Sequence, residues 1–148
     1  MKSVYRFALL FLVMGMAYSQ LELFWKGYTN LPMTFIGGTA GSLIGALDSH
    51  RAKNNDKLWP VYLVGLIIIL DLEFISGSIF NLYFHMNLWD YSRDFMNLDG
   101  QICLPYALLW LALIPGTVWL NELLRWKLFD EPVPPGLWYY YKSLFAFK

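Results

Sequence analysis

The chain has few charged residues and a single cysteine. Only 15% of its 148 residues are charged, against about a quarter in a typical soluble domain. Its 11 basic and 11 acidic side chains give a formal net charge of zero, which removes the electrostatic argument for nucleic-acid binding. Because Cys103 is the only cysteine, an internal disulfide and a cysteine-based metal cage are both excluded.

Several ligand-binding motifs are absent as well. The sequence has no Gly-x-x-x-x-Gly-Lys-Ser/Thr loop, so this chain cannot cradle ATP alone. It also has no His-Glu-x-x-His pair, no calcium loop and no Gly-x-Ser-x-Gly turn. His85, Asp90, Asp94 and Asp99 could gather around a metal, but their spacing matches no zinc or calcium pattern. We therefore expect neither a metal site nor a cofactor.

The sequence is rich in hydrophobic and aromatic residues, which make up 57% and 19% of it. A helix of about 20 mostly apolar residues can cross a bilayer. We predict an all-α polytopic membrane protein, with a bundle of four transmembrane helices over residues 1–128. The four segments are approximately residues 4–23, 31–47, 58–84 and 102–124. Pro115 should kink the fourth, because it removes a backbone hydrogen bond.

The first apolar segment has a second interpretation. Lys2 and Arg6, the apolar run after them and the small residues near Ser19 are also typical of a secretory signal peptide over residues 1–19. We expect a transmembrane helix here, with cleavage as the open alternative.

Lysine and arginine favour the cytoplasmic side of membrane proteins. Lys26 and Arg93 flank the segments on one side, and the other nine basic residues lie on the opposite side. This asymmetry predicts a multi-pass protein of the cell membrane with both termini in the cytoplasm and residues 85–103 facing outward. The nine residues are Lys2, Arg6, Arg51, Lys53, Lys57, Arg125, Lys127, Lys142 and Lys148.

Residues 129–148 differ in character from the four segments. They begin with a proline-rich spacer, which should be stiff and non-helical. The aromatic stretch from Leu137 to Phe147 is about half of a spanning length. We predict a short interfacial helix on the cytoplasmic leaflet, and the alternative is a tail folded back on the bundle.

Gly37, Gly41 and Gly45 recur every four residues in the second segment. Small residues at this spacing let helices approach closely, so we predict helix packing, within the bundle or between protomers of a homo-oligomer. A substrate path lined by backbone is the alternative.

Asp71 and Glu73 interrupt the third segment. Charged residues within a membrane normally face the protein interior or water. At 100° per residue, Asp71 and His85 project near one another, with Glu73 at the edge of the same face. We predict a polar cluster in the outer part of the bundle, in which Glu73 and Asp90 meet and Lys26 or Arg93 supplies the counter-charge. The candidate ligand-binding or functional residues are Glu22, Lys26, Tyr28, Asp71, Glu73, Asn81, His85, Trp89, Asp90, Tyr91 and Arg93. A purely structural pairing of these charges is the alternative.

Three stretches resemble a known family, and the first of them is "ELFWKGYTNLPMTFIGGTAG" at residues 22–41. Leu72-Glu73-Phe74 and "LWDYSRDFMNLDGQICL" at residues 88–104 are similar to the signature of small membrane proteins labelled "putative ABC-transporter type IV", or CmpB-like. The resemblance extends over residues 22–124. It departs from the family pattern where Lys26 replaces an expected arginine, Asn30 replaces an expected histidine and Met96 precedes Asn97. The motif positions are Glu22, Lys26, Gly27, Tyr28, Thr29, Gly37, Gly38, Glu73, Trp89, Asp90, Tyr91, Ser92, Asn97, Gly100 and Cys103.

The resemblance implies a permease, and three functions stay open. The first is a permease-like protein that binds a small polar or amphipathic ligand from outside, as a homo-oligomer or beside a separate ATPase or membrane partner. The second is an intramembrane enzyme acting on a lipid headgroup, with Glu73 and Asp90 as an acid–base pair. The third is a structural or sensor subunit of a membrane complex. We favour the first, which is not enzymatic.

Overall fold

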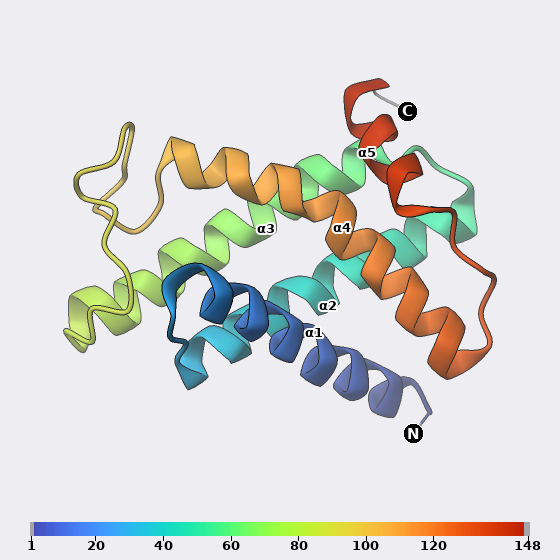
Figure 1. The fold of residues 1–148 in the computed structure, drawn as a ribbon, viewed down its shortest axis with the longest axis horizontal. Helices are drawn as coiled ribbons and strands as arrows, with labels where there is room; N and C mark the ends of the chain where they lie inside the picture. The colour runs from blue at the N-terminus through green and yellow to red at the C-terminus, as the bar shows by residue number, and fades with distance from the viewer. Residues whose placement is uncertain (1, 147–148) are drawn as a thin grey trace.

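The computed structural model describes residues 2–146 as five α-helices, one short π-helical segment and connecting loops (Figure 1). Residues 1, 147 and 148 lie outside the described residues, as do the side chains of residues 2 and 3. The predictions that involve Phe147, Lys148 and the Lys2 side chain fall there. No β-strand forms within residues 2–146. The elements are α1 (Lys2–Lys26), α2 (Leu31–Asn54), α3 (Trp59–Gly77), η1 (Ser78–Tyr83), α4 (Leu104–Phe129) and α5 (Leu137–Ala146).

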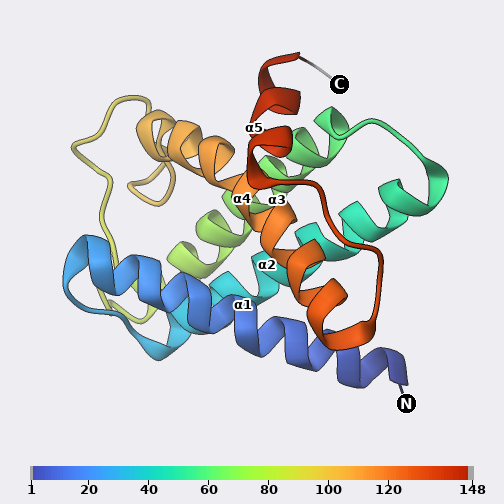
Figure 2. The same ribbon diagram turned by 45° about the vertical axis from the view of Figure 1, so that its right-hand side comes forward.

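The four long helices run in alternating directions along the molecule (Figure 1). The loop of residues 84–103 therefore lies at one end, which we call the loop end. The start of α1 and the helix α5 lie toward the other end, which we call the terminal end. α2 contacts α1, α3 and α4, and α4 contacts each of the other four α-helices. α5 packs against α3 and α4 (Figure 2).

Proline begins three of the helices. Pro32, Pro60 and Pro105 stand in the first turns of α2, α3 and α4, where the missing N–H would have no helical partner. The residues that follow α2 and α4, Asn55 and Asp130, have left-handed φ angles of 55° and 54°. A left-handed residue closes many helix C-termini.

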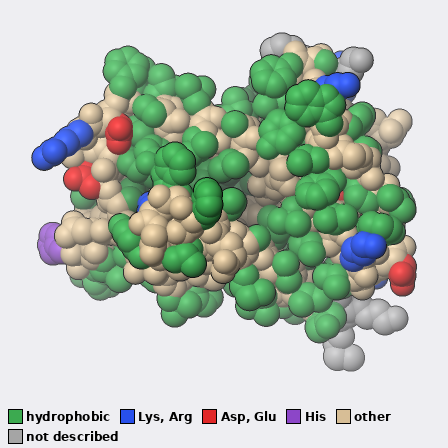
Figure 3. Space-filling model, viewed as in Figure 1, with side chains coloured by type: hydrophobic (Ala, Val, Ile, Leu, Met, Phe, Trp, Pro, Cys, Tyr) green, Lys and Arg blue, Asp and Glu red, His purple; other side chains and the backbone are tan. Residues whose placement is uncertain are grey.

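Three helical stretches are long and apolar enough to cross a membrane: Val4–Lys26, Trp59–Tyr83 and Leu104–Phe129. The second joins α3 to η1. α2 has 24 residues but does not join this group, because glycine, serine and threonine dilute its apolar part and its last turns are charged. The all-α fold is therefore confirmed, with three candidate membrane crossings among the described residues, whereas the fourth crossing remains a prediction. Figure 3 shows hydrophobic side chains over much of the displayed face and charged ones toward its two ends.

Two irregularities shape the long helices. α4 contains Pro115 yet remains one helix, and Figure 1 shows that it changes direction partway along. Such a bend is expected where proline removes a backbone hydrogen bond. α3 continues into the π-helical η1, whose wider turn carries the buried Asn81.

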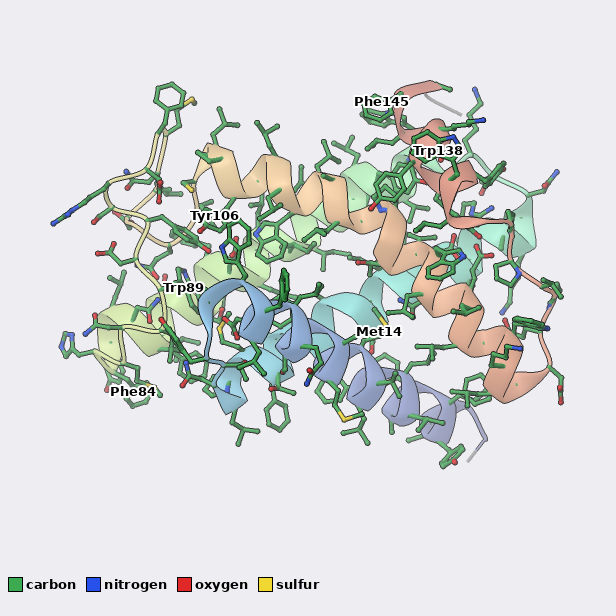
Figure 4. The ribbon with its side chains drawn as sticks, in the orientation of Figure 1. Met14, Phe84, Trp89, Tyr106, Trp138 and Phe145 are labelled. Carbon is green, nitrogen blue, oxygen red and sulfur yellow. The ribbon has the colours of Figure 1, made fainter. Side chains whose placement is uncertain are left out.

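The aromatic tail folds back on the bundle. Tyr140 of α5 is only 1% exposed, and its carbonyl accepts a 3.0 Å hydrogen bond from the Tyr62 hydroxyl. The indole of Trp59 donates to the carbonyl of Leu144 at 3.2 Å. The folded-back alternative is therefore the one that forms. Trp138 stays exposed, so contact between this helix and a membrane surface remains a prediction (Figure 4).

The glycine stripe (Gly37, Gly41 and Gly45) is buried inside the chain. A Cβ atom added to Gly41 would lie 2.8 Å from Cβ of Met14 on α1. On the α4 side, the amide of Asn121 donates to the Gly41 carbonyl at 3.0 Å. Because α1 and α4 already cover these glycines, a homo-oligomer would have to use another surface.

Candidate functional site

A half-open cavity of about 270 Å³ lies between the helices of the bundle. Its wall is mostly apolar and includes Met14 of α1, Ile36 of α2 and Leu113 of α4. Trp89 lines it at the loop end. Glu73 of α3 is the one charged side chain among the described residues that line the cavity. A site of this composition suits a ligand with an apolar body and one polar group.

Glu73 is held by two neutral donors. Its side chain is buried, and Oε2 accepts a 2.9 Å hydrogen bond from the indole Nε1 of Trp110. The Tyr91 hydroxyl donates to Oε1 at 3.3 Å. We call these three residues the Glu73 cluster. The cluster joins α3, the loop and α4, so it ties the loop end to the cavity.

Tyr91 keeps its proton in this arrangement. Burial raises the pKa of the Tyr91 phenol above its usual range, and the nearby Glu73 carboxylate raises it further. The ring stacks on Tyr106 of α4, with 4.4 Å between ring centroids. The phenol is therefore a fixed hydrogen-bond donor to the carboxylate, which orients Glu73 toward the cavity wall.

Asn81 fastens the loop to the end of the third helix. Its amide donates to the Trp89 carbonyl at 3.0 Å and to Oε1 of Gln101 at 2.9 Å. Its Oδ1 accepts the backbone N–H of Leu88 at 2.7 Å. The Trp89 indole then donates to the Gln101 carbonyl at 3.0 Å. These bonds place Trp89 at the loop end of the cavity.

Glu22 and Lys26 form a separate pair at the end of α1. The buried Glu22 carboxylate lies 2.9 Å from the Lys26 ammonium and accepts a 2.6 Å hydrogen bond from Thr29. Lys26 thus pairs with Glu22 and forms no ion pair with Glu73 among the described residues, and its role as counter-charge to Glu73 remains a prediction. Arg93, the other expected counter-charge, is exposed.

Asp71 and Glu73 face opposite ways. Side chains two positions apart in the sequence of an α-helix point about 200° apart around its axis. When Glu73 points into the bundle, Asp71 therefore points out of it. Asp71 is exposed. The shared polar face that we predicted for Asp71 and Glu73 therefore does not form, and Asp71 takes no part in the Glu73 cluster.

The predicted meeting of Glu73 and Asp90 is also wrong. Asp90 is exposed, and its Oδ1 accepts a 2.8 Å hydrogen bond from the backbone N–H of Ser92. That bond lowers the pKa of the Asp90 carboxyl below its usual range. An aspartate that accepts from the backbone N–H two residues later is common in turns. The Asp90 carboxylate therefore has its hydrogen-bond partner within the loop and does not contact Glu73.

Tyr28 and His85 are exposed at the loop end and do not join the Glu73 cluster. Tyr28 is 55% exposed, and the His85 backbone has a left-handed φ of 55°. Of the candidate residues, the structure therefore brings Glu73 and Tyr91 together directly, with Trp89 and Asn81 beside them.

A second polar group, which the sequence analysis did not single out, lies at the terminal end. The fully buried Asp48 of α2 pairs with Arg51 at 2.5 Å and with Arg125 of α4 at 2.9 Å. Glu122 pairs with Arg51 at 3.1 Å and accepts a 2.7 Å hydrogen bond from Tyr140. We call Asp48, Arg51, Glu122 and Arg125 the Asp48 cluster. The cluster joins α2 to α4, and the hydrogen bond from Tyr140 to Glu122 links it to α5.

The sequence did not identify Trp110, which bonds to Glu73, or Gln101, which bonds to Asn81 and Trp89. Trp110 lies in an apolar run, where only its indole N–H distinguishes it from packing residues. The Asp48 cluster had a clearer signal. Asp48 and Arg51 stand three residues apart, as do Glu122 and Arg125, a spacing that brings charges to one helix face.

The Glu73 cluster places a carboxylate beside an apolar surface. Among the described residues, no group of three or more histidine, cysteine, aspartate and glutamate side chains is placed to hold a metal ion. The cavity offers one carboxylate in an apolar wall, and Trp110 and Tyr91 fix the orientation of that carboxylate by hydrogen bonds. Such a set can orient the polar end of an amphipathic molecule.

A family model described as "Putative ABC-transporter type IV" matches residues 5–135. No curated protein and no solved structure matches the chain. Several residues that carry the sequence resemblance bond to one another. The Tyr91 hydroxyl donates to Glu73, Thr29 donates to Glu22, and Gly100 donates its N–H to Asn97. The motif thus coincides with the residues that build the loop end.

Proposed function

The chain belongs to the family described as "Putative ABC-transporter type IV", and from this premise we propose that it is a permease-type membrane protein that binds an amphipathic ligand. The observation that carries the proposal is the Glu73 carboxylate in the wall of an apolar cavity. The apolar body of the ligand would occupy the cavity, and its polar head would meet the Glu73 cluster.

The charge of Glu73 indicates which head group fits. Tyr91 and Trp110 donate hydrogen bonds but carry no positive charge. No basic side chain of the described residues forms an ion pair with Glu73. A buried carboxylate without an ion-pair partner is costly, and an ammonium group would supply such a partner. We therefore propose single-chain amines as the ligand class.

The Glu73→Gln variant tests this proposal. Gln keeps the shape of the side chain but removes the charge, so we expect affinity for an alkylamine to fall about tenfold or more, because a hydrogen bond to a charged group contributes about 1.5–3 kcal/mol. Photolabelling with a diazirine-bearing decylamine, in lipid nanodiscs and with decylamine as competitor, would measure the affinity. Saturable labelling should map to α4 near Leu113, which lines the cavity.

Asp71→Asn is the matched control, because it removes the same charge two residues away at an exposed position. It should leave decylamine binding unchanged. Decanol, which lacks the ammonium group, should compete weakly and equally in both variants. Equal amine affinity in the wild type and in Glu73→Gln would contradict the proposal. A loss of thermal stability without a loss of affinity would instead support the structural-subunit alternative.

The enzyme alternative draws less support from the geometry. It requires Glu73 and Asp90 to divide acid and base roles across one substrate. Asp90 is exposed and bonded to the Ser92 amide, so this pair is not assembled. A single carboxylate in an apolar cavity fits binding better than acid–base chemistry by two carboxylates.

The transport assignment also needs an energy source. The sequence has no phosphate-binding loop of its own, so we propose that a separate ATPase chain serves the permease. We further propose four membrane crossings in the cell membrane, with α2 as the fourth. Its charged last turns would lie at the cytoplasmic surface, together with both termini.

A cysteine at Asp56, in a Cys103→Ser background, tests this topology. Asp56 is exposed in the connection between α2 and α3, and unlike Asn55 it has no left-handed backbone for a substitution to strain. With the connection in the cytoplasm, a membrane-impermeant maleimide should label this cysteine only after the cells are opened. A cysteine at the exposed Arg93 is the control and should react in intact cells. Labelling of position 56 from outside would contradict the proposed orientation.

A further inference from the structure

Asp71 is an exposed carboxylate in the middle of a membrane-spanning stretch. The stretch Trp59–Tyr83 has 25 residues, which places Asp71 about 18 Å from either end at about 1.5 Å per residue. Within the described residues it has no hydrogen-bond or ion-pair partner. This distinguishes it from the buried carboxylates of Glu22, Asp48 and Glu73, each of which is bonded.

The helix face around Asp71 is otherwise apolar and uncovered. Ile67 and Ile75, one turn to either side, are 51% and 57% exposed, and Ile79 is 45% exposed. The opposite face, which includes Tyr62 and Glu73, is buried in the bundle. Asp71 therefore stands in the centre of a ridge of isoleucines that the rest of this chain does not touch.

A bare carboxylate at this depth is strongly unfavourable in lipid. Insertion of an aspartate at the centre of a membrane helix is disfavoured by roughly a hundredfold, and such residues normally face protein or water. The side chain is too short to reach a surface about 18 Å away, as lysine and arginine near helix ends can. Something other than lipid should therefore cover Asp71 in the membrane.

We propose that this face of α3, centred on Asp71, binds a transmembrane helix of another membrane protein that carries a lysine or arginine near its middle. The positive side chain would neutralise Asp71, and the isoleucine ridge would pack between side chains of the partner helix. A second copy of this chain does not fit, because a two-fold contact centred here would oppose two carboxylates. The surface faces away from the cavity and is independent of ligand binding there.

The test uses the full-length protein and a synthetic probe helix in phosphatidylcholine vesicles. The probe is a leucine-rich transmembrane peptide with one central arginine. The control peptide is identical except that it has leucine at that position. Energy transfer from a dye at Asp56→Cys, in the Cys103→Ser background, reports association. We expect the arginine helix to associate about five- to tenfold more strongly with the wild-type face than with Asp71→Asn, within the range of measured polar contacts between membrane helices.

Charge exchange completes the test. Asp71→Arg should bind a probe helix with a central aspartate and reject the arginine helix. Because the side chain is exposed, Asp71→Asn should retain the wild-type helix content and thermal midpoint. If Asp71→Arg does not fold, the comparison of the wild type with Asp71→Asn decides the test alone. Equal association of the arginine helix with the wild type and Asp71→Asn would overturn the proposal. So would self-association of labelled protein that is lost in Asp71→Asn, which would identify a second copy as the occupant.

Discussion

Replacing Asp48 with leucine should lower the free energy of unfolding by about 3–5 kcal/mol, which is typical when one partner of a buried ion pair is removed. Asp48 is 0% exposed and contacts both Arg51 and Arg125. Arg51 retains Glu122 at 3.1 Å after the change, whereas the 7%-exposed Arg125 is left with the more exposed Glu131 and neutral acceptors. Most of the loss should therefore come from the stranded charge of Arg125.

Unfolding of the purified protein in mixed detergent micelles would measure this difference. In the double variant Asp48→Leu/Arg125→Met both charges are gone, so most of the lost stability should return. Arg6→Ala is the surface control. It removes a 3.5 Å pair with Glu131, whose side chains are 47% and 38% exposed, and a cation–π contact 4.8 Å from the centre of the Phe129 ring. At exposed sites each of these interactions contributes at most about 1 kcal/mol. Less than about 1 kcal/mol lost in Asp48→Leu would show that water reaches the Asp48 cluster.

The position of the third helix could be predicted closely, but the end of the second could not. The sequence predicted a helix over residues 58–84, and the structure has one stretch at Trp59–Tyr83. The two agree because the apolar run and the proline in its first turn coincide with the helix. The second helix was expected to end at residue 47 and continues to Asn54. Hydropathy marks where apolar residues stop, whereas the backbone of α2 continues through charged turns that the Asp48 cluster stabilises.

The inward carboxylate of the site was predictable, but its partners were not. The sequence placed Glu73 in a polar cluster, and the structure buries it. The sequence indicated charged partners for Glu73, whereas the donors are the phenol of Tyr91 and the indole of Trp110. Aromatic side chains in an apolar sequence are indistinguishable from packing residues until the fold brings their polar atoms to an acceptor.

Asn81→Leu should loosen the loop end and expose Cys103. The substitution removes three hydrogen bonds and leaves the N–H of Leu88 and the carbonyl of Trp89 without their partner. A buried polar group without a partner costs about 1–3 kcal/mol, so we expect about 2–4 kcal/mol less stability for the closed loop. The helices away from the loop end do not depend on these bonds, so the loss should be local rather than global.

The single cysteine gives a direct measure of this local opening. Cys103 is 3% exposed and packs in one buried cluster with Trp89 and Tyr91, and burial raises the pKa of its thiol. Opening the loop would admit a maleimide and return the thiol pKa toward its ordinary value, so both effects increase the reaction rate. A destabilisation of about 2 kcal/mol corresponds to roughly 30-fold faster labelling when opening limits access.

Arg93→Gln is the matched control, because Arg93 lies in the same loop but is exposed and forms no ion pair within the described residues. Its labelling rate should equal that of the wild type at the same pH. Helix content measured by circular dichroism should be unchanged in both variants, which separates local opening from global unfolding. Unaltered Cys103 labelling in Asn81→Leu would show that the Trp89 and Tyr91 packing holds the loop without Asn81. The position of Trp89 in the cavity wall would then depend on apolar burial and on its own bond to the Gln101 carbonyl.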